Sequence, residues 1–408
     1  MATQSTNILI LGAGIGGYEI FRQLEKKLRH SKNKKKITIV DRNNYFTFAP
    51  LLHEVASGAV EPIHATLPLR EVVYQTPHQF FQAEIQKIDP TTKTVQTSAG
   101  DITYDYCVMA LGCGVNYYGV PGAKEFSYTV RTLPAAMNLR RAIIHKIEQS
   151  DTEIALTVVG GGYTGVEVIG QLAHLVDHDL KKLYPEKHIH LSLIQNAPSL
   201  VPALPVKAQK IIDKRLKKMN VTVLCNDAVK EVRKNSVVLN SGEQPSDFTI
   251  WCAGNFDDMT QLLPSDYCVK GRVPVTHFLN HEHSSTLYGV GDLIIASNVG
   301  EKNFYPQLAE AAYKEADYVA QHILATMRGK TLRPFNFHSV GTLMPIGDGF
   351  GLVIIGQMVF SGWVAWWIRR TVYVFFLPGW LHKIRLMFDW SLRLISFRYI
   401  VDIEGEQK

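Results

Sequence analysis

The chain carries the same glycine fingerprint twice, and each copy follows a run of apolar, largely β-branched residues. In such a motif the first glycine permits a tight turn out of a strand, the second lets the backbone approach a pyrophosphate, and the third lets the following helix pack on the strand. The N-terminus of that helix then holds the anion. Two copies predict two dinucleotide sites, and a chain with two such sites can pass a hydride between them. The copies are Gly12-x-Gly14-x-Gly16-Gly17 and Gly160-x-Gly162-x-x-Gly165.

The first copy lies in a complete nucleotide-binding pattern. Residues 7–11 are predicted to form a buried parallel strand, residues 18–29 a helix and residues 37–40 the next strand. Asp41 ends that strand, close to the spacing expected for the carboxylate that accepts hydrogen bonds from a ribose.

The second copy is equally regular but ends in a different residue. Residues 154–159, 166–176 and 189–194 are predicted as strand, helix and strand, and Gln195 follows. An acid at this position would repel the extra phosphate of NADPH, and Gln195 removes that repulsion. No arginine follows in residues 196–199 to clamp a phosphate. We therefore expect weak discrimination between NADH and NADPH, with a solvent-exposed Gln195 as the alternative.

The composition indicates an enzyme of a reducing compartment. At 408 residues and 46% hydrophobic content, the chain should form two or three domains. Its cysteines show no CxxC pair and no zinc spacing, so we expect neither disulfides nor a metal site. The first strand follows Met1 closely, which predicts no signal or transit peptide. A lysine-rich run between residues 26 and 36 lacks interleaved aromatic residues, so we interpret it as a solvated loop and expect no nucleic-acid partner.

The C-terminal tail predicts contact with a lipid surface. Residues 358–399 combine tryptophans with basic residues, the composition of a helix lying in the headgroup plane. Residues 349–368 carry no charge and reach the length of a spanning helix, but a hairpin turn at Gly356-Gln357 and a break at Ser361-Gly362 argue against one. An ordinary core helix or a dimer interface is the alternative. The aromatic and basic residues are Trp363, Trp366, Trp367, Trp380, Trp390, Arg369, Arg370, Lys383, Arg385, Arg393 and Arg398.

Together these residues resemble the type II NADH:quinone oxidoreductases, membrane-bound members of the flavoprotein superfamily with two dinucleotide-binding domains. The similarity runs through nearly the whole chain, although Leu111 replaces the threonine usual in the flavoprotein turn. The segments that carry it are residues 41–52 with 55–58, 104–106 with 110–112, 117–122, 160–167, 251–254, 288–292 and 339–343.

The resemblance implies an α/β fold with two Rossmann-like dinucleotide-binding domains, one for FAD and one for NAD(P)H, plus a C-terminal helical segment at the membrane interface. The expected boundaries are 1–114 and 280–335 for the split FAD domain, 115–279 for the NAD(P)H domain and 336–408 for the membrane segment. Besides the fingerprint glycines, Asp41 and Gln195, the cofactor-binding candidates are Arg42, Pro50, Leu51, Ala110, Gly112, Gly254, Gly291 and Asp292.

The activity implied is transfer of a hydride from NADH, and potentially NADPH, to FAD, and then of two electrons to a membrane quinone. The resemblance also implies a peripheral protein on the cytoplasmic face of the inner membrane, and we expect a homodimer. It places the carboxylate of Glu167 beside the nicotinamide, where we expect a positioning role; stabilisation of the helix start is the alternative.

Both glutamines of the family's Ala-Gln-x-Ala-x-Gln stretch are replaced, by Glu310 and Lys314. Four residues apart on a helix, they share a face and are expected to form an ion pair. The pair is either a weak surface contact or, if it lines the quinone channel, an aid to protonation of the reduced quinone.

Two rival functions stay open at this point. A sulfide:quinone oxidoreductase needs a cysteine pair near the flavin, and no cysteine follows Cys268. A non-catalytic flavoprotein that binds NAD(P)H would be reduced by NADH without rapid reoxidation by a quinone.

Overall fold

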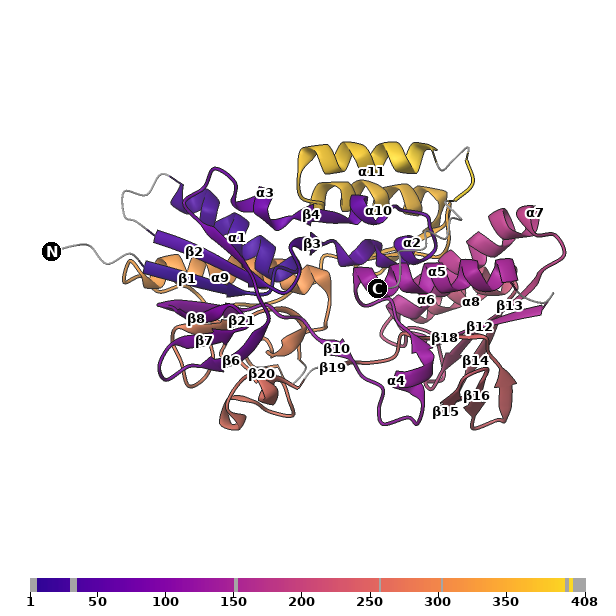
Figure 1. Cartoon of the computed structure of the whole chain (residues 1–408), viewed down its shortest axis with the longest axis horizontal. Coiled ribbons are helices and arrows are strands. Elements are labelled where there is room, and N and C mark those ends of the chain that lie inside the picture. The colour runs from indigo at the N-terminus through magenta and orange to yellow at the C-terminus, as the bar shows by residue number, and fades with distance from the viewer. Residues whose placement is uncertain are drawn as a thin grey trace. The chain divides into compact units, whose positions relative to one another are not determined.

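The computed structural model describes residues 6–29, 35–149, 153–256, 258–301, 304–392 and 396–398. The chain forms two compact units (Figure 1). The first unit comprises residues 1–48, 66–114 and 255–339, and the second comprises residues 49–65, 115–254 and 340–408. Each unit contains one of the glycine fingerprints.

The first unit is built on a parallel sheet in the strand order β21–β9–β1–β2–β5. The apolar side chains at 8–11 in β1 are completely buried, as expected for a strand covered on both faces. The strands are β1 (Thr6–Leu11), β2 (Lys35–Asp41), β5 (Gln79–Gln82), β9 (Tyr106–Met109) and β21 (Leu287–Gly289).

Helix α1 (Ile15–Leu28) follows the first fingerprint and packs against α9 (Ala309–Thr326). It begins three residues before the predicted start at Tyr18, because Gly16 and Gly17 belong to its first turn and are buried there. The smaller elements of this unit are β3 (Tyr45–Thr47), β4 (Thr66–Pro68), α3 (Leu69–Val73), the antiparallel β6 (Ile85–Asp89), β7 (Thr94–Thr97) and β8 (Gly100–Thr103), η4 (Met259–Gln261), η5 (Ser265–Tyr267), β20 (Val273–Pro274), η6 (Gly291–Leu293) and β22 (Ile294–Ile295).

The second unit repeats the plan with a parallel sheet in the order β11–β18–β12–β13–β14. The strands are β11 (Ser127–Tyr128), β12 (Glu153–Val159), β13 (His188–Gln195), β14 (Val221–Cys225) and β18 (Phe248–Trp251). Helix α6 (Tyr163–Leu175) follows the second fingerprint. The other elements are η1 (Ala49–Leu51), α2 (Leu52–Ala56), η2 (Pro62–Ala65), α4 (Ala123–Phe126), α5 (Leu133–Gln149), the π-helical η3 (Val176–Leu180), α7 (Lys181–Leu183), α8 (Val206–Lys218), β15 (Val229–Arg233), β16 (Ser236–Leu239) and β17 (Glu243–Pro245). The α/β fold with parallel sheets is therefore confirmed.

The C-terminal part of the second unit is a small antiparallel sheet followed by two helices. Strands β23 (Thr342–Pro345), β24 (Gly351–Ile355) and β25 (Met358–Gly362) pair in order, and the turn between the last two contains Gly356 with φ +57°. The predicted hairpin at Gly356-Gln357 is thus confirmed. Helices α10 (Trp363–Phe376) and α11 (Trp380–Leu392) follow and contact each other. Among the described residues, every helix is too short or too polar to cross a membrane.

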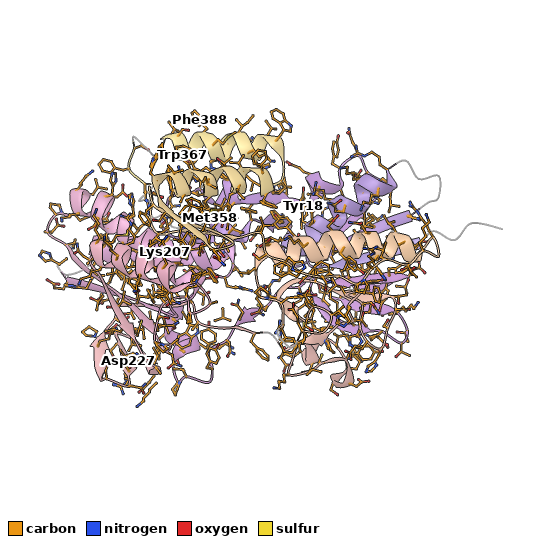
Figure 2. The ribbon with its side chains drawn as sticks, turned by 180° about the vertical axis from the view of Figure 1, so that it is seen from behind. Tyr18, Lys207, Asp227, Met358, Trp367 and Phe388 are labelled. Carbon is orange, nitrogen blue, oxygen red and sulfur yellow. The ribbon has the colours of Figure 1, made fainter. Side chains whose placement is uncertain are left out.

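The interpretation of the tail as uniformly interfacial is wrong for some of its residues. Arg369, Arg370 and Arg398 are at most 6% exposed, and Trp366 and Trp390 are similarly buried. These side chains face acidic and polar groups of the second unit, which a count of residue types along the tail does not reveal. Figure 2 shows Trp367 on α10 and Phe388 on the outer side of α11. Arg393 lies outside the described residues.

Candidate functional site

The first fingerprint forms a turn that only glycine can make. Gly12 has φ +92°, and a Cβ there would lie 2.5 Å from the carbonyl oxygen of Ala110. A Cβ on Gly17 would lie 1.9 Å from the carbonyl oxygen of Gly12, and one on Gly16 would lie 2.8 Å from the Cγ2 of Val290. The glycines therefore let β1, α1 and the strand ends beside them pack closely.

The middle glycine has a different role, because the space beside it is open. Gly14 is the N-cap of α1, it is exposed, and a Cβ on it would meet no described atom within 4 Å. No described side chain caps the helix. The free N–H groups of the first helical turn thus face an open cradle, which fits a pyrophosphate.

Asp41 is held rigidly at the end of β2, beside this cradle. Its Oδ2 accepts a hydrogen bond of 2.7 Å from the backbone nitrogen of Ala13, and its Oδ1 accepts one of 2.7 Å from Asn43. The carboxylate therefore lies where the ribose of a dinucleotide is expected. Arg42 next to it is exposed, and its carbonyl oxygen accepts a hydrogen bond from Gln82.

The second fingerprint has the same geometry. Gly160 has φ +106°, and a Cβ on it would lie 2.7 Å from the nitrogen of Ala253. A Cβ on Gly165 would lie 1.8 Å from the carbonyl oxygen of Gly160. Gly162 is the N-cap of α6, without a cap from any described side chain and with open space where its Cβ would be. This unit therefore has an anion cradle of its own.

Gln195 occupies the position in the second unit that Asp41 occupies in the first. Its Oε1 accepts a hydrogen bond of 3.3 Å from the nitrogen of Gly161, and its Nε2 donates to the carbonyl oxygen of Ser199 at 3.3 Å. The side chain is half-buried beside the glycine turn, so the alternative of a simply solvent-exposed Gln195 is wrong. The residue at this position is therefore a neutral amide in the second unit and an acid in the first.

The remaining cofactor candidates lie in both units. Gly112, with φ +70°, follows the buried Ala110 after β9 in the first unit. Gly254, with φ +73°, follows β18 in the second unit, and a Cβ on it would touch the ring of Tyr118. Pro50 and Leu51 lie in η1, a segment that belongs to the second unit.

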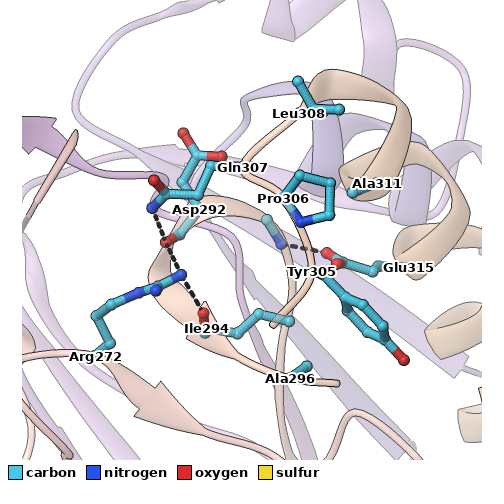
Figure 3. A pocket seen from close by; sticks show the side chains of 11 residues that line it. Arg272, Asp292, Ile294, Ala296, Tyr305, Pro306, Gln307, Leu308, Ala311 and Glu315 are labelled. Atoms are coloured by element: carbon cyan, nitrogen blue, oxygen red, sulfur yellow. Dashed lines mark hydrogen bonds between the residues drawn. The ribbon is translucent and has the colours of Figure 1, made fainter. Parts of the chain in front are cut away.

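Side chains of the first unit form hydrogen bonds with the backbone of the Gly291–Asp292 turn (Figure 3). Glu315 of α9 accepts a hydrogen bond of 2.6 Å from the nitrogen of Gly291. Gln307 and Arg272 donate to the carbonyl oxygen of Asp292 at 2.9 Å and 3.1 Å. The carboxylate of Asp292 accepts a hydrogen bond of 3.3 Å from the thiol of Cys113.

Burial raises the pKa of Glu315 to about 7, against the opposing effect of its hydrogen bond from Gly291 and with a further contribution from the charge of Asp292. Burying a carboxylate in its charged form is costly, so the neutral carboxyl is favoured here. Sequence reasoning did not select Glu315, because an acid at an inward position of an amphipathic helix has no motif.

Glu310 and Lys314 form the predicted ion pair, with Nζ 2.8 Å from Oε1. Lys314 also donates to the carbonyl oxygen of His338, and Ser339 donates to the second carboxylate oxygen of Glu310 at 2.7 Å. The pair is about a third exposed and connects α9 to the segment after it. The ammonium also lies 5.3 Å from the ring centroid of Phe337.

Glu167 lies on α6 in the second unit, beside buried polar side chains. The Nδ1 atom of His53 is 3.8 Å from its Oε2, and Arg369 lies near enough to lower its pKa. Burial dominates and raises the pKa of Glu167 to about 8, so this carboxyl is mainly neutral at pH 7. The stabilisation of a helix start by a charged Glu167 is correspondingly disfavoured.

The histidine and the arginine beside Glu167 have defined protonation states. Burial, and then the charge of Arg369, lower the pKa of His53 to about 3, so it is neutral. Arg369 can only donate, so its contact of 3.2 Å makes the Nε2 of His53 an acceptor and leaves the proton on Nδ1, facing Glu167. Arg369 itself forms a buried ion pair of 2.6 Å with Glu54, which also accepts a hydrogen bond of 3.0 Å from Trp390.

The comparisons with known proteins agree with two nucleotide modules. A sequence model of the pyridine nucleotide-disulphide oxidoreductase family matches residues 6–316. The chain belongs to this family. It is 27% identical over 373 residues to the type II NADH:quinone oxidoreductase of Staphylococcus haemolyticus, covering 86% of this chain and 91% of that protein.

Two solved structures share the fold of this pyridine nucleotide-disulphide oxidoreductase. One is NDH2 from Plasmodium falciparum in complex with NADH, with a TM-score of 0.88, 19% identity and coverage of 98% and 100% of the two chains. The other is the sulfide:quinone oxidoreductase from Aquifex aeolicus, with a TM-score of 0.77, 18% identity and coverage of 95% and 92%. At these identities the structures establish the shared fold.

The buried charges of this family member are not among the residues predicted from its sequence. His53 and Glu54 lie between the two segments, 41–52 and 55–58, that carry the resemblance, so no matched motif pointed to them. Arg369 was interpreted as a lipid-facing basic residue. A usable signal was the adjacent pair Arg369-Arg370 at the end of an uncharged stretch, since two charges inside an apolar helix require partners.

Proposed function

We propose that this protein is a type II NADH:quinone oxidoreductase that holds FAD in its first unit and NADH in its second. The observation that carries the proposal is the pair of helix N-termini at Gly14 and Gly162, which no side chain of the described residues caps and which each lie beside an open cradle. The relatives' names and the family membership support the same reaction class. FAD, when bound, accepts the hydride and delivers two electrons to the quinone.

The residues of the chain then bind and orient. Asp41 is proposed to accept hydrogen bonds from the adenosine ribose of FAD, and Asp292 to bind its ribityl chain. Gly112 and Ala110 would line the same cofactor. In the second unit, Gln195 would face the ribose of the nicotinamide coenzyme and Gly254 would lie beside it, and the neutral amide would accept both NADH and NADPH.

Glu167 is proposed to position the nicotinamide as a neutral carboxylic acid. Its burial beside His53 supports this, because an uncharged carboxyl can donate a hydrogen bond to a carboxamide oxygen. Glu310 and Lys314 are proposed to assist protonation of the reduced quinone. Glu310→Gln and Lys314→Met should then slow turnover with quinone without slowing flavin reduction by NADH.

The outer faces of α10 and α11 are proposed to bind a lipid surface. They expose large apolar side chains together with Arg385, and an exposed apolar patch beside basic residues is typical of a surface that binds lipid. The exposed set is Trp363, Val364, Ile368, Phe375, Phe376, Trp380, Leu381, Ile384, Met387, Phe388 and Leu392. We propose that this lipid surface is the cytoplasmic face of the inner membrane. The five free cysteines agree with that reducing compartment.

We also propose that the protein is a homodimer. Sedimentation of the purified protein at several concentrations tests this proposal.

The deciding experiment is steady-state oxidation of NADH and NADPH by the purified protein with short-chain quinones, with the released flavin identified by chromatography. Rapid NADH-dependent quinone reduction by an FAD-containing protein is expected. Sulfide is supplied as the donor in a parallel assay. Turnover with sulfide but not NADH would favour the sulfide:quinone reaction, and flavin reduction without reoxidation by any quinone would favour a non-catalytic flavoprotein.

A further inference from the structure

Arg398, near the end of the chain, is buried in a polar pocket of the second unit. Its Nη1 donates to the carbonyl oxygens of Gln171 at 3.0 Å and Ser57 at 3.3 Å. Its Nη2 donates to the Oε1 of Gln171 at 2.9 Å and to the Oδ2 of Asp348 at 2.7 Å. Its backbone nitrogen donates to Asp179 at 3.2 Å, and its Nε lies 3.6 Å from the other oxygen of that carboxylate.

The partners of Arg398 come from three parts of the chain that are far apart in the sequence, one of which supplies both Gln171 and Asp179. Ser57 follows α2, Gln171 is on α6, Asp179 is on η3, and Asp348 lies in the turn between β23 and β24. The partners also bond to one another, because Gln171 donates to Asp348 at 3.3 Å and accepts a hydrogen bond of 3.4 Å from Ser57. One guanidinium thus connects four segments of the second unit.

The pocket depends on the charge of the arginine. Burial raises the pKa of Asp348, but the positive charge of Arg398, with His174 and Arg370, outweighs it and holds that pKa below its ordinary value. Asp179 is 1% exposed. Without Arg398, the carboxylate of Asp348 would lose a charged hydrogen-bond donor and the carboxylate of Asp179 would lose the guanidinium 3.6 Å away. A buried carboxylate without a partner is strongly unfavourable.

The segments that Arg398 connects also build the surroundings of Glu167. Helix α2 supplies His53 and helix α6 supplies Glu167, while the β23–β24 turn belongs to the sheet on which α10, with Arg369, packs. Glu167 and Gln171 are four residues apart on α6 and therefore share a face of that helix. A shift of α2 against α6 would change the distance between His53 and Glu167.

We infer that Arg398 is a positioning residue for the nicotinamide half of the reaction: it holds α2, α6 and the β23–β24 turn together so that Glu167 stays in its place beside His53. This inference rests on the proposed function. It gives the end of the chain a role at the coenzyme site that is separate from any contact with lipid.

The test measures flavin reduction by NADH in stopped flow, without quinone, across pH 5–10. The variants are Arg398→Ala, Arg398→Lys and the matched control Arg141→Ala, which removes an exposed arginine of α5 in the same unit. In Arg398→Ala, the better-solvated Glu167 should move the midpoint of the pH profile down by about one unit or more. The dissociation constant for NADH, measured by fluorescence titration, should rise roughly tenfold.

Arg398→Lys should lie between wild type and Arg398→Ala, because an ammonium cannot bond to Gln171 and Asp348 with the planar fork of arginine. Arg141→Ala should match wild type. Flavin content and circular dichroism are recorded on every sample. A folded Arg398→Ala that keeps the wild-type midpoint and NADH affinity overturns the inference.

If Arg398→Ala does not fold, Arg398→Lys serves as the test. A wild-type pH profile and a wild-type affinity for NADH in Arg398→Lys would then overturn the inference. A second pair of chains separates the arginine from the rest of the tail: one ends after Tyr399 and keeps Arg398, and the other ends after Phe397. Only the shorter chain should show the shifted midpoint. Failure of the proposed function would appear separately, as absence of NADH-dependent flavin reduction in the wild type.

Discussion

Asp41 and Gln195 occupy equivalent positions in the two units, each at the end of the second strand and each accepting a hydrogen bond from the glycine turn. The bond from Ala13 to Asp41 measures 2.7 Å, and the bond from Gly161 to Gln195 measures 3.3 Å. The shorter bond is the one with a charged acceptor, as expected. The two sites thus differ in charge at the point where the ribose of a dinucleotide is expected.

Replacing Gln195 with Glu should raise the preference for NADH over NADPH about tenfold, because a carboxylate there repels the 2′-phosphate. The measurement is the ratio of the two kcat/KM values with one quinone. Gln209→Glu, on α8 of the same unit, serves as the charge control. An unchanged ratio in the Gln195 variant would show that this side chain does not face the ribose.

Replacing Asp41 with Ala should weaken FAD binding by about 1.5–3 kcal/mol, the value of a hydrogen bond to a charged group. The loss includes the support that the carboxylate gives to the nitrogen of Ala13. Flavin occupancy after dialysis and the dissociation constant after reconstitution measure the effect. Asp101→Ala, at an exposed position of β8, should retain full occupancy. Equal affinity in the two variants contradicts the assignment of Asp41.

Replacing Glu167 with Gln should make the free energy of unfolding less dependent on pH. In the folded protein its pKa is raised to about 8, so between the ordinary pKa of 4.5 and this value the unfolded chain is ionised while the folded chain holds the proton. Stability is therefore lost as pH rises through this window, and the loss is complete above it. Glu167→Gln should gain about 4 kcal/mol relative to wild type between pH 5 and pH 8.5, because each pKa unit corresponds to about 1.4 kcal/mol. Urea unfolding at both pH values measures the difference, and parallel curves at both would contradict the prediction.

Replacing Arg369 with Met should destabilise the second unit by about 3–5 kcal/mol, because it leaves the carboxylate of Glu54 buried without its cation. The double variant with Glu54→Gln should be more stable than the sum of the single effects predicts, since no unpaired charge remains. Thermal and urea unfolding of the four proteins give the coupling energy. Additive effects would mean that the two side chains do not act as a pair.

The sequence predicts the structure correctly where a conformation depends on residues close together in the chain. A glycine with φ +92° or +106° at the start of each fingerprint, and the turn at Gly356, follow from patterns a few residues long. Buried pairs such as Glu54 with Arg369, or Arg398 with Asp179, join residues hundreds of positions apart, and no periodicity reveals them. For the same reason the tail's basic residues were all assigned to a lipid surface.

The helix start at Ile15 was missed for a related reason. Gly16 and Gly17 weaken a helix by local propensity, and only their close packing against Val290 and Gly12 explains their place in the first turn. Local propensity therefore predicts that helix α1 starts at Tyr18, whereas tertiary packing makes it start at Ile15.

Substituting the exposed apolar residues of α10 and α11 should release the protein from membranes while the fold remains intact. Phe375, Trp380 and Phe388 are 75%, 70% and 64% exposed, so serine at all three positions removes no core contact. Deletion from Met358 onward is less informative, because it also removes β25, Arg369 and Arg398. The triple variant should lower partition into anionic vesicles roughly 100-fold, since each side chain contributes apolar burial in the lipid. It should reduce turnover with long-chain quinones more than with soluble ones, at unchanged flavin content.

A flavin-replete triple variant that still sediments with vesicles would show that another surface binds the membrane. A tag placed after Lys408 that is accessible only from the opposite side of the membrane would exclude one-sided attachment.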